Sequence, residues 1–252
     1  MTRRALGIAL IGLMVAALGG CGDDNGTPTL RVSAAASLKN AFEDYGSLFK
    51  DADVSYSFAG SDELAAQIRK GVRPDVFAAA NTKLPDQLFA DGLVEKPVPF
   101  ASNRLVLAVP GDGGSVSSLQ DLDNDGVRIA AGSPSVPVGS YTRKVLAKLG
   151  AQQADAIERN IRSNEPDVSG VVGKVSQGAV DAGFVYITDV QASGGRLKAV
   201  ELPARLQPRV VYGAAVVKGT DHPTEARELI DGLLSGDGQQ ALEEAGFEPV
   251  GP

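Results

Sequence analysis

After its first 28 residues the sequence alternates between short apolar runs and amphipathic segments, and no other feature restricts the fold as strongly. The runs Leu30 to Ala35, Val54 to Phe58 and Asp75 to Ala80 have the length of strands. The segments Ser37 to Phe49 and Ser61 to Lys70 have the period of helices. Strands and helices that alternate at this spacing form a parallel sheet with helices on both faces, so the sequence predicts an α/β fold.

The rest of the chain continues this pattern in a second unit, with helices gathered in its middle. We expect further strands at Leu105 to Pro110, Val127 to Ala131, Gly183 to Ile187 and Arg209 to Val217. We expect further helices at Lys83 to Asp91, Val138 to Leu149 with a stop at Gly150, Asp155 to Ile161, Asp167 to Gln177, Pro223 to Leu234 and Asp237 to Ala245. A chain of 252 residues is long enough for two lobes with cores of their own.

Two of the predicted helices begin with a serine directly after a strand. Ser37 follows three alanines and Ser61 follows Gly60, so each serine is placed as the N-cap of its helix. The free N–H groups of a first helical turn, with a hydroxyl beside them, form a donor-only pocket suited to an anion. The two serines could therefore line one crevice at the carboxyl edge of the sheet, or they could serve only as helix caps.

Residues 1 to 20 have the pattern of an export signal, with Arg3 and Arg4 followed by an apolar segment and then small residues. The sequence Leu18-Gly19-Gly20-Cys21 resembles the lipobox of bacterial lipoproteins, in which the cysteine is acylated. Cys21 is the only cysteine, which excludes an intramolecular disulfide. We expect a lipid anchor at Cys21 and a tether over residues 21–28; the alternative is an incidental cysteine behind an ordinary signal peptide.

The charge of the chain argues against nucleic acid or an anionic membrane surface as a partner. The formal net charge is −7, and it becomes −9 without residues 1–20, which contain two arginines and no acidic residue. If the protein binds an anion, local dipoles rather than long-range attraction must hold it.

Motifs for catalysis or metal binding are incomplete. Asp121, Asp123 and Asp125 match the first half of a calcium loop, but the glutamate expected at its twelfth position is replaced by a glycine, which favours a solvated turn. Ser47 and Lys50 match the Ser-x-x-Lys motif of acyl-transfer enzymes, without the further motifs of that class. The chain has one histidine, which leaves too few ligands for zinc and favours binding over chemistry.

Six motifs occur in the order found in one known family. They are Ala34-Ala35-Ala36-Ser37-Leu38, Phe58-Ala59-Gly60-Ser61, Pro74-Asp75-Val76-Phe77, Asn103-Arg104-Leu105-Val106-Leu107, Val136-Pro137-Val138-Gly139-Ser140-Tyr141 and Gly183-Phe184-Val185-Tyr186. The chain resembles the molybdate-binding proteins of bacterial molybdate ABC importers from about Leu30 to its C-terminus. The resemblance implies a two-lobed, type II periplasmic-binding-protein-like α/β fold, with the ligand between the lobes. It implies one lobe of residues 29–104 and 210–252, another of residues 105–209, and crossings near 104–109 and 209–217.

The resemblance also implies the ligand-binding residues. The serine ligands of the family fall on Ser37 and Ser61, two backbone N–H donors fall on Val138 and Val168, and a tyrosine hydroxyl donor falls on Tyr186. The chain departs from the family at Ser133-Pro134-Ser135 and at Pro166, on the rim of the second lobe. Molybdate is a fully deprotonated dianion that only accepts hydrogen bonds, so a matched site contains donors and no carboxylate.

These features predict an extracytoplasmic solute-binding protein rather than an enzyme. We expect a lipid-anchored monomer that captures molybdate, and also tungstate, without a cofactor and delivers it to a membrane permease. Another tetrahedral oxyanion, chiefly sulfate, is the nearest alternative, and an acyl-transfer enzyme that uses Ser47 and Lys50 is the alternative of another class. Because His222 is remote in sequence from every predicted ligand, we expect an affinity that is nearly flat between about pH 6 and 9.

Overall fold

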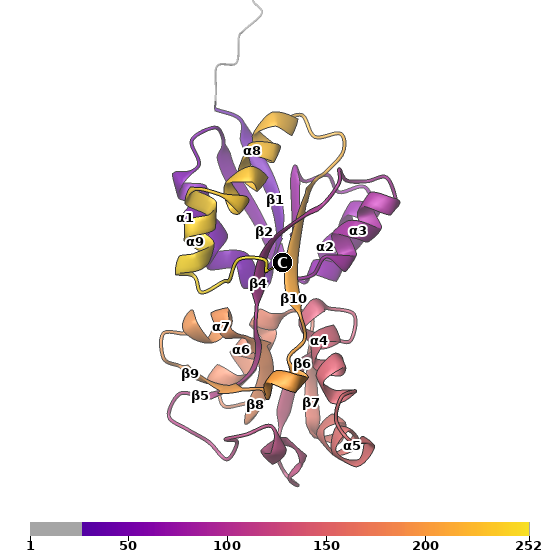
Figure 1. The fold of residues 1–252 in the computed structure, drawn as a ribbon, viewed down its shortest axis with the longest axis vertical. Coiled ribbons are helices and arrows are strands. Elements are labelled where there is room, and N and C mark those ends of the chain that lie inside the picture. Colours follow the sequence, from indigo (N-terminus) through magenta and orange to yellow (C-terminus); the bar gives the residue numbers. More distant parts are fainter. Residues whose placement is uncertain (1–26, 252) are drawn as a thin grey trace, which may run out of the picture.

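The computed structural model describes residues 27–251, which form two lobes joined end to end (Figure 1). The predicted export signal, the lipidation site Cys21 and most of the predicted tether lie outside the described residues. Each lobe is built around a five-stranded sheet with helices packed on it. The predicted two-lobed α/β fold is therefore confirmed.

The sheet of the first lobe has the strand order β2-β1-β3-β10-β4. Its strands are β1 (Thr29–Ala35), β2 (Asp53–Ala59), β3 (Val76–Ala79), β4 (Val98–Asn103) and β10 (Val210–Val216). β1 runs parallel to β2 and β3, whereas β10 runs antiparallel to both β3 and β4. The predicted parallel arrangement of β1, β2 and β3 is confirmed, and the late strand β10 joins this sheet in the opposite direction.

The sheet of the second lobe has the order β7-β6-β8-β5-β9. Its strands are β5 (Leu105–Pro110), β6 (Ile129–Gly132), β7 (Ile161–Glu165), β8 (Ala182–Tyr186) and β9 (Leu197–Glu201). β6 pairs in parallel with β7 and β8, and β5 pairs antiparallel with β8 and β9. The apolar strands β3 and β8 are buried along their whole length.

Helices cover both sheets. The first lobe carries α1 (Lys39–Leu48), α2 (Ser61–Arg69), α3 (Lys83–Ala90), α8 (Pro223–Leu234) and α9 (Asp237–Glu244). The second lobe carries α4 (Pro137–Leu146), α5 (Ala151–Asn160), α6 (Val168–Ser176) and α7 (Ile187–Gln191). Short 3-10 turns occur at η1 (Ala36–Leu38), η2 (Gln120–Asp123) and η3 (Ala204–Leu206). None of the helices within residues 27–251 has the length and apolar character needed to span a bilayer.

The predicted and the observed elements differ in two informative ways. The helix expected to run to Leu149 and stop at Gly150 ends at Leu146, and Gly150 instead takes the N-cap position of α5. The strands β4, β7 and β9 and the short helix α7 were not expected. These three strands lie at sheet edges and contain polar residues or a proline, so their sequences lack the apolar run of a central strand.

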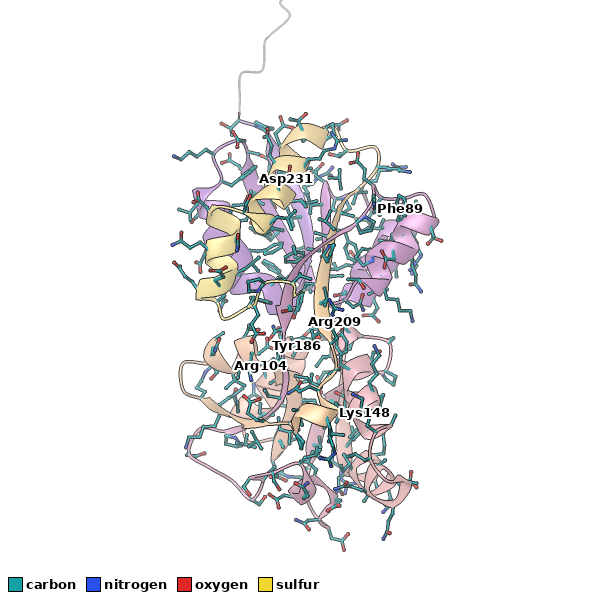
Figure 2. The ribbon with its side chains drawn as sticks, viewed as in Figure 1. Phe89, Arg104, Lys148, Tyr186, Arg209 and Asp231 are labelled. Carbon is teal, nitrogen blue, oxygen red and sulfur yellow. The ribbon has the colours of Figure 1, made fainter. Side chains whose placement is uncertain are left out.

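The chain passes between the lobes twice. The first passage is at Arg104, between β4 and β5, and the second is over residues 202–209, between β9 and β10. The Arg104 guanidinium lies 2.9 Å from a carboxylate oxygen of Glu201 in the second lobe and 3.3 Å from one of Glu248 near the C-terminus. Arg104 and Arg209 both lie at the waist of the molecule, close to Tyr186 in the view of Figure 2.

Candidate functional site

A small cavity lies between the lobes, and all five predicted ligand residues line it. Ser37 and Ser61 come from the first lobe, and Val138, Val168 and Tyr186 come from the second. The cavity has a volume of about 20 Å³. Because sites for drug-sized molecules occupy roughly 300–1,000 Å³, this cavity suits one small ligand.

Ser61 places its hydroxyl oxygen against the neighbouring strand rather than its own helix. The prediction of Ser61 as an N-cap is wrong, because Gly60 takes that position in an extended conformation and Ser61 is the first residue of α2. The Ser61 hydroxyl oxygen accepts a hydrogen bond from the Ala80 N–H at 3.1 Å. The oxygen is thus already an acceptor within the protein, and the hydroxyl hydrogen is available to a ligand.

Ser37 is also not an N-cap. A 3-10 turn, η1, precedes α1 and contains Ser37 in its middle, while Leu38 takes the N-cap position of α1. The Ser37 hydroxyl lies 2.9 Å from the hydroxyl of Tyr212, a residue 175 positions later on β10. Both serines therefore line the cavity as predicted, but tertiary contacts rather than helix capping orient them.

The second lobe directs the N-termini of two helices at the cavity. In α4 the first bond of the helix runs from the Ser140 N–H to the Val136 carbonyl, so the Val138 N–H has no acceptor within the helix. In α6 the Asp167 side chain caps the Gly170 N–H at 3.0 Å, and the Val168 N–H, one residue after the cap, likewise has no helical acceptor. These N–H groups lie at the positive ends of the helix dipoles, which favour an anion.

Tyr186 supplies a buried hydroxyl without a partner. It is the last residue of β8, its side chain is 1% exposed, and its hydroxyl makes no hydrogen bond within the described part of the chain. Burial raises the pKa of this hydroxyl well above its ordinary value, which keeps the proton on the oxygen at neutral pH. Buried polar groups are normally satisfied, so an unpaired donor at a cavity wall points to a ligand.

Two carboxylates that were not predicted lie at the site, one in the cavity lining and one in contact with a lining residue. Asp167 is among the lining residues, so the expectation of a site without any carboxylate is wrong; its side chain is engaged in capping α6. Asp189 accepts a hydrogen bond from the Tyr186 N–H at 2.9 Å. Burial of the Asp189 carboxyl, reinforced by the negative Asp167, raises its pKa to about 7. One sequence signal could have identified Asp189 as a residue beside the site: it follows the strand-end Tyr186 by three positions. An acidic residue at that spacing often accepts the backbone N–H at the start of a helix.

The other candidate motifs lie away from this cavity. Asp121 uses its carboxylate to accept hydrogen bonds from Ser117 and Ser118, and residues 27–251 contain no group of three acidic, histidine or cysteine residues able to hold a metal. Ser47 and Lys50 are exposed near the end of α1, and the Ser47 hydroxyl donates to the Asp44 carbonyl at 2.7 Å. His222 precedes α8 and does not line the cavity.

The arrangement can bind a small anion that only accepts hydrogen bonds. Three hydroxyl groups and two helix N-termini converge on the cavity from both lobes, and none of its lining residues is a lysine or arginine. The negative charge of such a ligand would be balanced by neutral dipoles, each a fixed donor.

The chain matches the family model of bacterial extracellular solute-binding proteins over residues 30–248. It is 34% identical to the molybdate-binding protein ModA of Mycobacterium tuberculosis (strain H37Rv), over 93% of this chain and 94% of that protein. It is also 34% identical to the putative ABC transporter substrate-binding lipoprotein YvgL of Bacillus subtilis, over 87% of this chain and 86% of that protein.

Solved structures show the same fold. The periplasmic molybdate-binding protein of Azotobacter vinelandii aligns with a TM-score of 0.78 at 24% identity, over 88% of this chain and 99% of that chain. The sulfate-binding protein SubI of Mycobacterium tuberculosis aligns with the same TM-score at 18% identity, over 89% and 88% of the two chains. The fold alone therefore does not distinguish the two ligands. The family model and the sequence relatives, which include molybdate-binding proteins, show that this chain belongs to the family of bacterial extracellular solute-binding proteins.

Proposed function

We propose that this protein captures molybdate, and also tungstate, outside the cytoplasm and delivers it to the permease of an ABC importer. The observation that carries the proposal is the buried hydroxyl of Tyr186, a residue of the cavity lining, which has no hydrogen-bond partner among residues 27–251. Around the same cavity, Ser37 and Ser61 supply hydroxyls, and Val138 and Val168 supply N–H groups. A fully deprotonated tetrahedral dianion satisfies all five donors at once.

Sulfate is the second candidate, because it has the same shape and charge as molybdate. The similarity of this fold to a sulfate-binding protein supports that alternative, whereas the sequence relatives with 34% identity support molybdate. Hydrogen phosphate carries a proton that requires an acceptor, and the Asp167 side chain near the cavity is already used to cap a helix.

We further propose that the protein catalyses no reaction and acts as a monomer anchored through Cys21. The lipobox-like sequence and the relative described as a lipoprotein support the anchor. The two sheets support lobe boundaries at Arg104 and near Val210, which agrees with a first lobe of residues 29–104 and 210–252 and a second of residues 105–209. The exposed position of Ser47 argues against an acyl-transfer enzyme.

A thermal-shift panel with molybdate, tungstate, sulfate and phosphate tests the proposal. A ligand present at about 1,000 times its dissociation constant stabilises the folded state by roughly 4 kcal/mol. For a protein of this size that corresponds to a rise in the melting temperature on the order of 10 °C. We expect the rise with molybdate and tungstate. A rise with sulfate alone would favour the second candidate, and no rise with any of the four anions would refute an oxyanion site.

A further inference from the structure

The orientation of the Ser37 hydroxyl depends on a residue outside the cavity lining. The hydroxyl oxygens of Ser37 and Tyr212 are 2.9 Å apart, and either could donate to the other. Only one of the two directions leaves the Ser37 hydrogen free for an anion. The partners of Tyr212 therefore determine what Ser37 can offer to a ligand.

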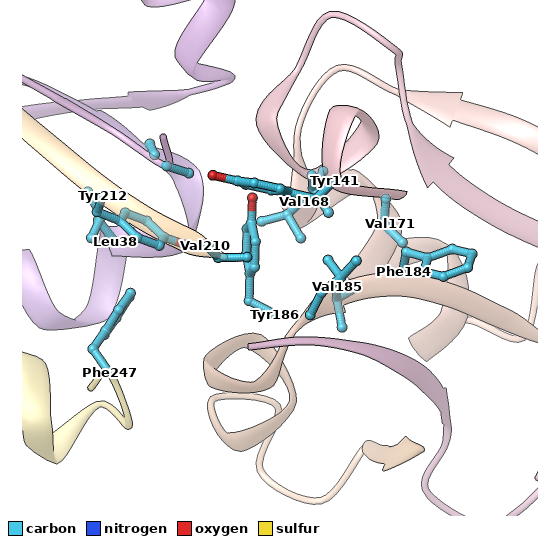
Figure 3. Packing of buried hydrophobic residues seen from close by; sticks show 14 of the residues in the cluster. Leu38, Tyr141, Val168, Val171, Phe184, Val185, Tyr186, Val210, Tyr212 and Phe247 are labelled. Carbon is cyan, nitrogen blue, oxygen red and sulfur yellow. The ribbon is translucent and has the colours of Figure 1, made fainter. Parts of the chain in front are cut away.

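Tyr212 is held in a fixed position between the lobes. Its side chain has no exposed surface. Its ring packs edge-on against Phe247 at 5.3 Å between centroids and against Tyr186 at 5.9 Å (Figure 3). The ring has no room to turn its hydroxyl toward water. Its proton must therefore go to a neighbouring acceptor within the protein.

The side-chain amide of Asn103, the last residue of β4, is engaged by residues other than Tyr212. Its side-chain carbonyl oxygen accepts from the Arg104 N–H at 2.8 Å, and its amide nitrogen donates to the Thr188 hydroxyl at 2.9 Å. These two bonds fix which end of the amide is nitrogen. Within residues 27–251, the hydrogen bond to Ser37 is the one that the Tyr212 hydroxyl forms.

The direction of the bond between Tyr212 and Ser37 follows from burial. The Tyr212 proton is out of reach of water and has the Ser37 oxygen as its acceptor in the described part of the chain, so Tyr212 donates to Ser37. Ser37 then keeps its own hydrogen for the cavity. The Ala80 N–H has the same effect on Ser61, since it occupies the oxygen of that hydroxyl.

We propose that Tyr212 is a positioning residue that makes Ser37 an obligate donor to the bound anion. The inference rests on the proposed function, because it assumes that Ser37 contacts the anion. It explains a preference for fully deprotonated oxyanions: Ser37 can give a hydrogen bond to an oxygen, but it cannot accept one from a protonated oxyanion such as hydrogen phosphate.

A double-mutant cycle tests the proposal. We expect Tyr212→Phe to weaken molybdate binding about 3- to 10-fold, as loss of one hydrogen bond does. In a Ser37→Ala background the same change should have less than about a twofold effect, because Tyr212 acts through Ser37. Tyr45→Phe is the matched control: it removes another buried tyrosine hydroxyl, which donates to the Leu229 carbonyl far from the cavity, and should leave affinity unchanged.

The outcomes separate this inference from the proposed function. If Ser37→Ala itself leaves the affinity unchanged, Ser37 is not a ligand and both this inference and the assignment of the proposed site fail. If Ser37→Ala weakens binding but Tyr212→Phe has the same effect in both backgrounds, Tyr212 is only structural and the inference alone is overturned.

Discussion

At the scale of single residues, the candidate site is defined by which groups already have partners. The oxygens of Ser61 and Ser37 are occupied by the Ala80 N–H and by the Tyr212 hydroxyl, so both serines are prepared to donate. The Tyr186 hydroxyl has no partner within the described residues and completes the donor set. The site is thus prearranged for an acceptor before any ligand enters, which reduces the free-energy cost of binding.

Ser61→Ala should weaken molybdate binding and also lower the stability of the ligand-free protein. Loss of one hydrogen bond to a charged ligand costs roughly 1.5–3 kcal/mol of binding free energy. The Ala80 N–H would also lose its acceptor, which lowers the free energy of unfolding by about 1–3 kcal/mol. Calorimetry and urea denaturation measure the two effects. Ser47→Ala, which changes an exposed serine, is the control; equal affinities in the two variants would contradict a ligand role for Ser61.

The Asp189 carboxyl should make the protein sensitive to pH, contrary to the flat affinity expected from the sequence. Its pKa is raised from 3.8 to about 7, so the folded protein retains a proton that the unfolded chain releases. The free energy of unfolding of the empty protein should therefore fall as the pH rises from about 4 to about 7. Asp189→Asn keeps an acceptor for the Tyr186 N–H and should remove this fall.

The affinity for molybdate should also depend on the ionisation of Asp189. The Asp189 carboxyl accepts the N–H of the cavity residue Tyr186, and Asp167 and the uncharged Tyr212 are its other neighbours. When Asp189 is ionised, its negative charge opposes a bound dianion. We expect molybdate affinity to decrease as the pH rises through about 7 in the wild-type protein and to stay constant in Asp189→Asn. Identical pH profiles for the two proteins would show that Asp189 does not sense the ligand.

Sequence reasoning could predict the site only in part. The small residues and serines after β1 and β2 indicated an anion pocket by themselves, and the resemblance to a family added Val138, Val168 and Tyr186. The partner of Ser37 could not be predicted, because Tyr212 is 175 residues away and the contact exists only in the tertiary structure. The Asp189 pKa was missed for the same reason, since burial rather than sequence raises it.

At the scale of secondary-structure elements, the N-terminus of α6 allows the contribution of one N–H group to be isolated. Val168 is the first residue of that helix, and Asp167 before it is extended, with φ −156° and ψ 176°. Proline is tolerated at the first position of a helix and has no N–H group to offer a ligand. We expect Val168→Pro to weaken binding by roughly 1.5–3 kcal/mol with little loss of helicity.

Val168→Ala is the matched control, because it shortens the buried side chain and keeps the N–H group. Its affinity should stay close to that of the wild-type protein when both are measured by calorimetry. If Val168→Ala weakened binding as strongly as Val168→Pro, the side chain rather than the backbone donor would be responsible.

The success of element prediction also depended on position in the fold. The central strands β1, β3, β5 and β8 are mostly buried, and all four were predicted close to their observed bounds. Edge strands such as β7 and β9 keep polar residues on their exposed positions, so they lack this signal. Local rules failed at the two serines because a tertiary hydrogen bond replaced the helix cap at each.

At the scale of the whole molecule, a glycine sets how closely the lobes approach each other. A Cβ atom on Gly60 of the first lobe would collide with the Pro166 carbonyl oxygen of the second. The Gly60 backbone, at φ −60° and ψ 133°, is itself acceptable to alanine. Gly60→Ala should therefore disturb the contact between the lobes rather than the fold of either one.

We expect Gly60→Ala to weaken molybdate binding at least tenfold, which is about 1.4 kcal/mol, while unfolding of the ligand-free protein changes little. Small-angle scattering with saturating molybdate should give a larger radius of gyration than for the wild-type protein. Gly150→Ala is the control, since a Cβ atom there meets no neighbour within 4 Å. Unchanged affinity in Gly60→Ala would show that the lobes need not approach this closely to hold the ligand.

Titration calorimetry of molybdate into the ligand-free protein tests the central claim most directly. The claim is that hydroxyl and N–H donors from both lobes enclose one tetrahedral dianion in the cavity. We predict saturable binding of one molybdate ion per chain, competition by tungstate, and loss of binding in the variant that combines Ser37→Ala and Ser61→Ala. The absence of saturable heat, or an unchanged affinity in the double variant, would contradict this account.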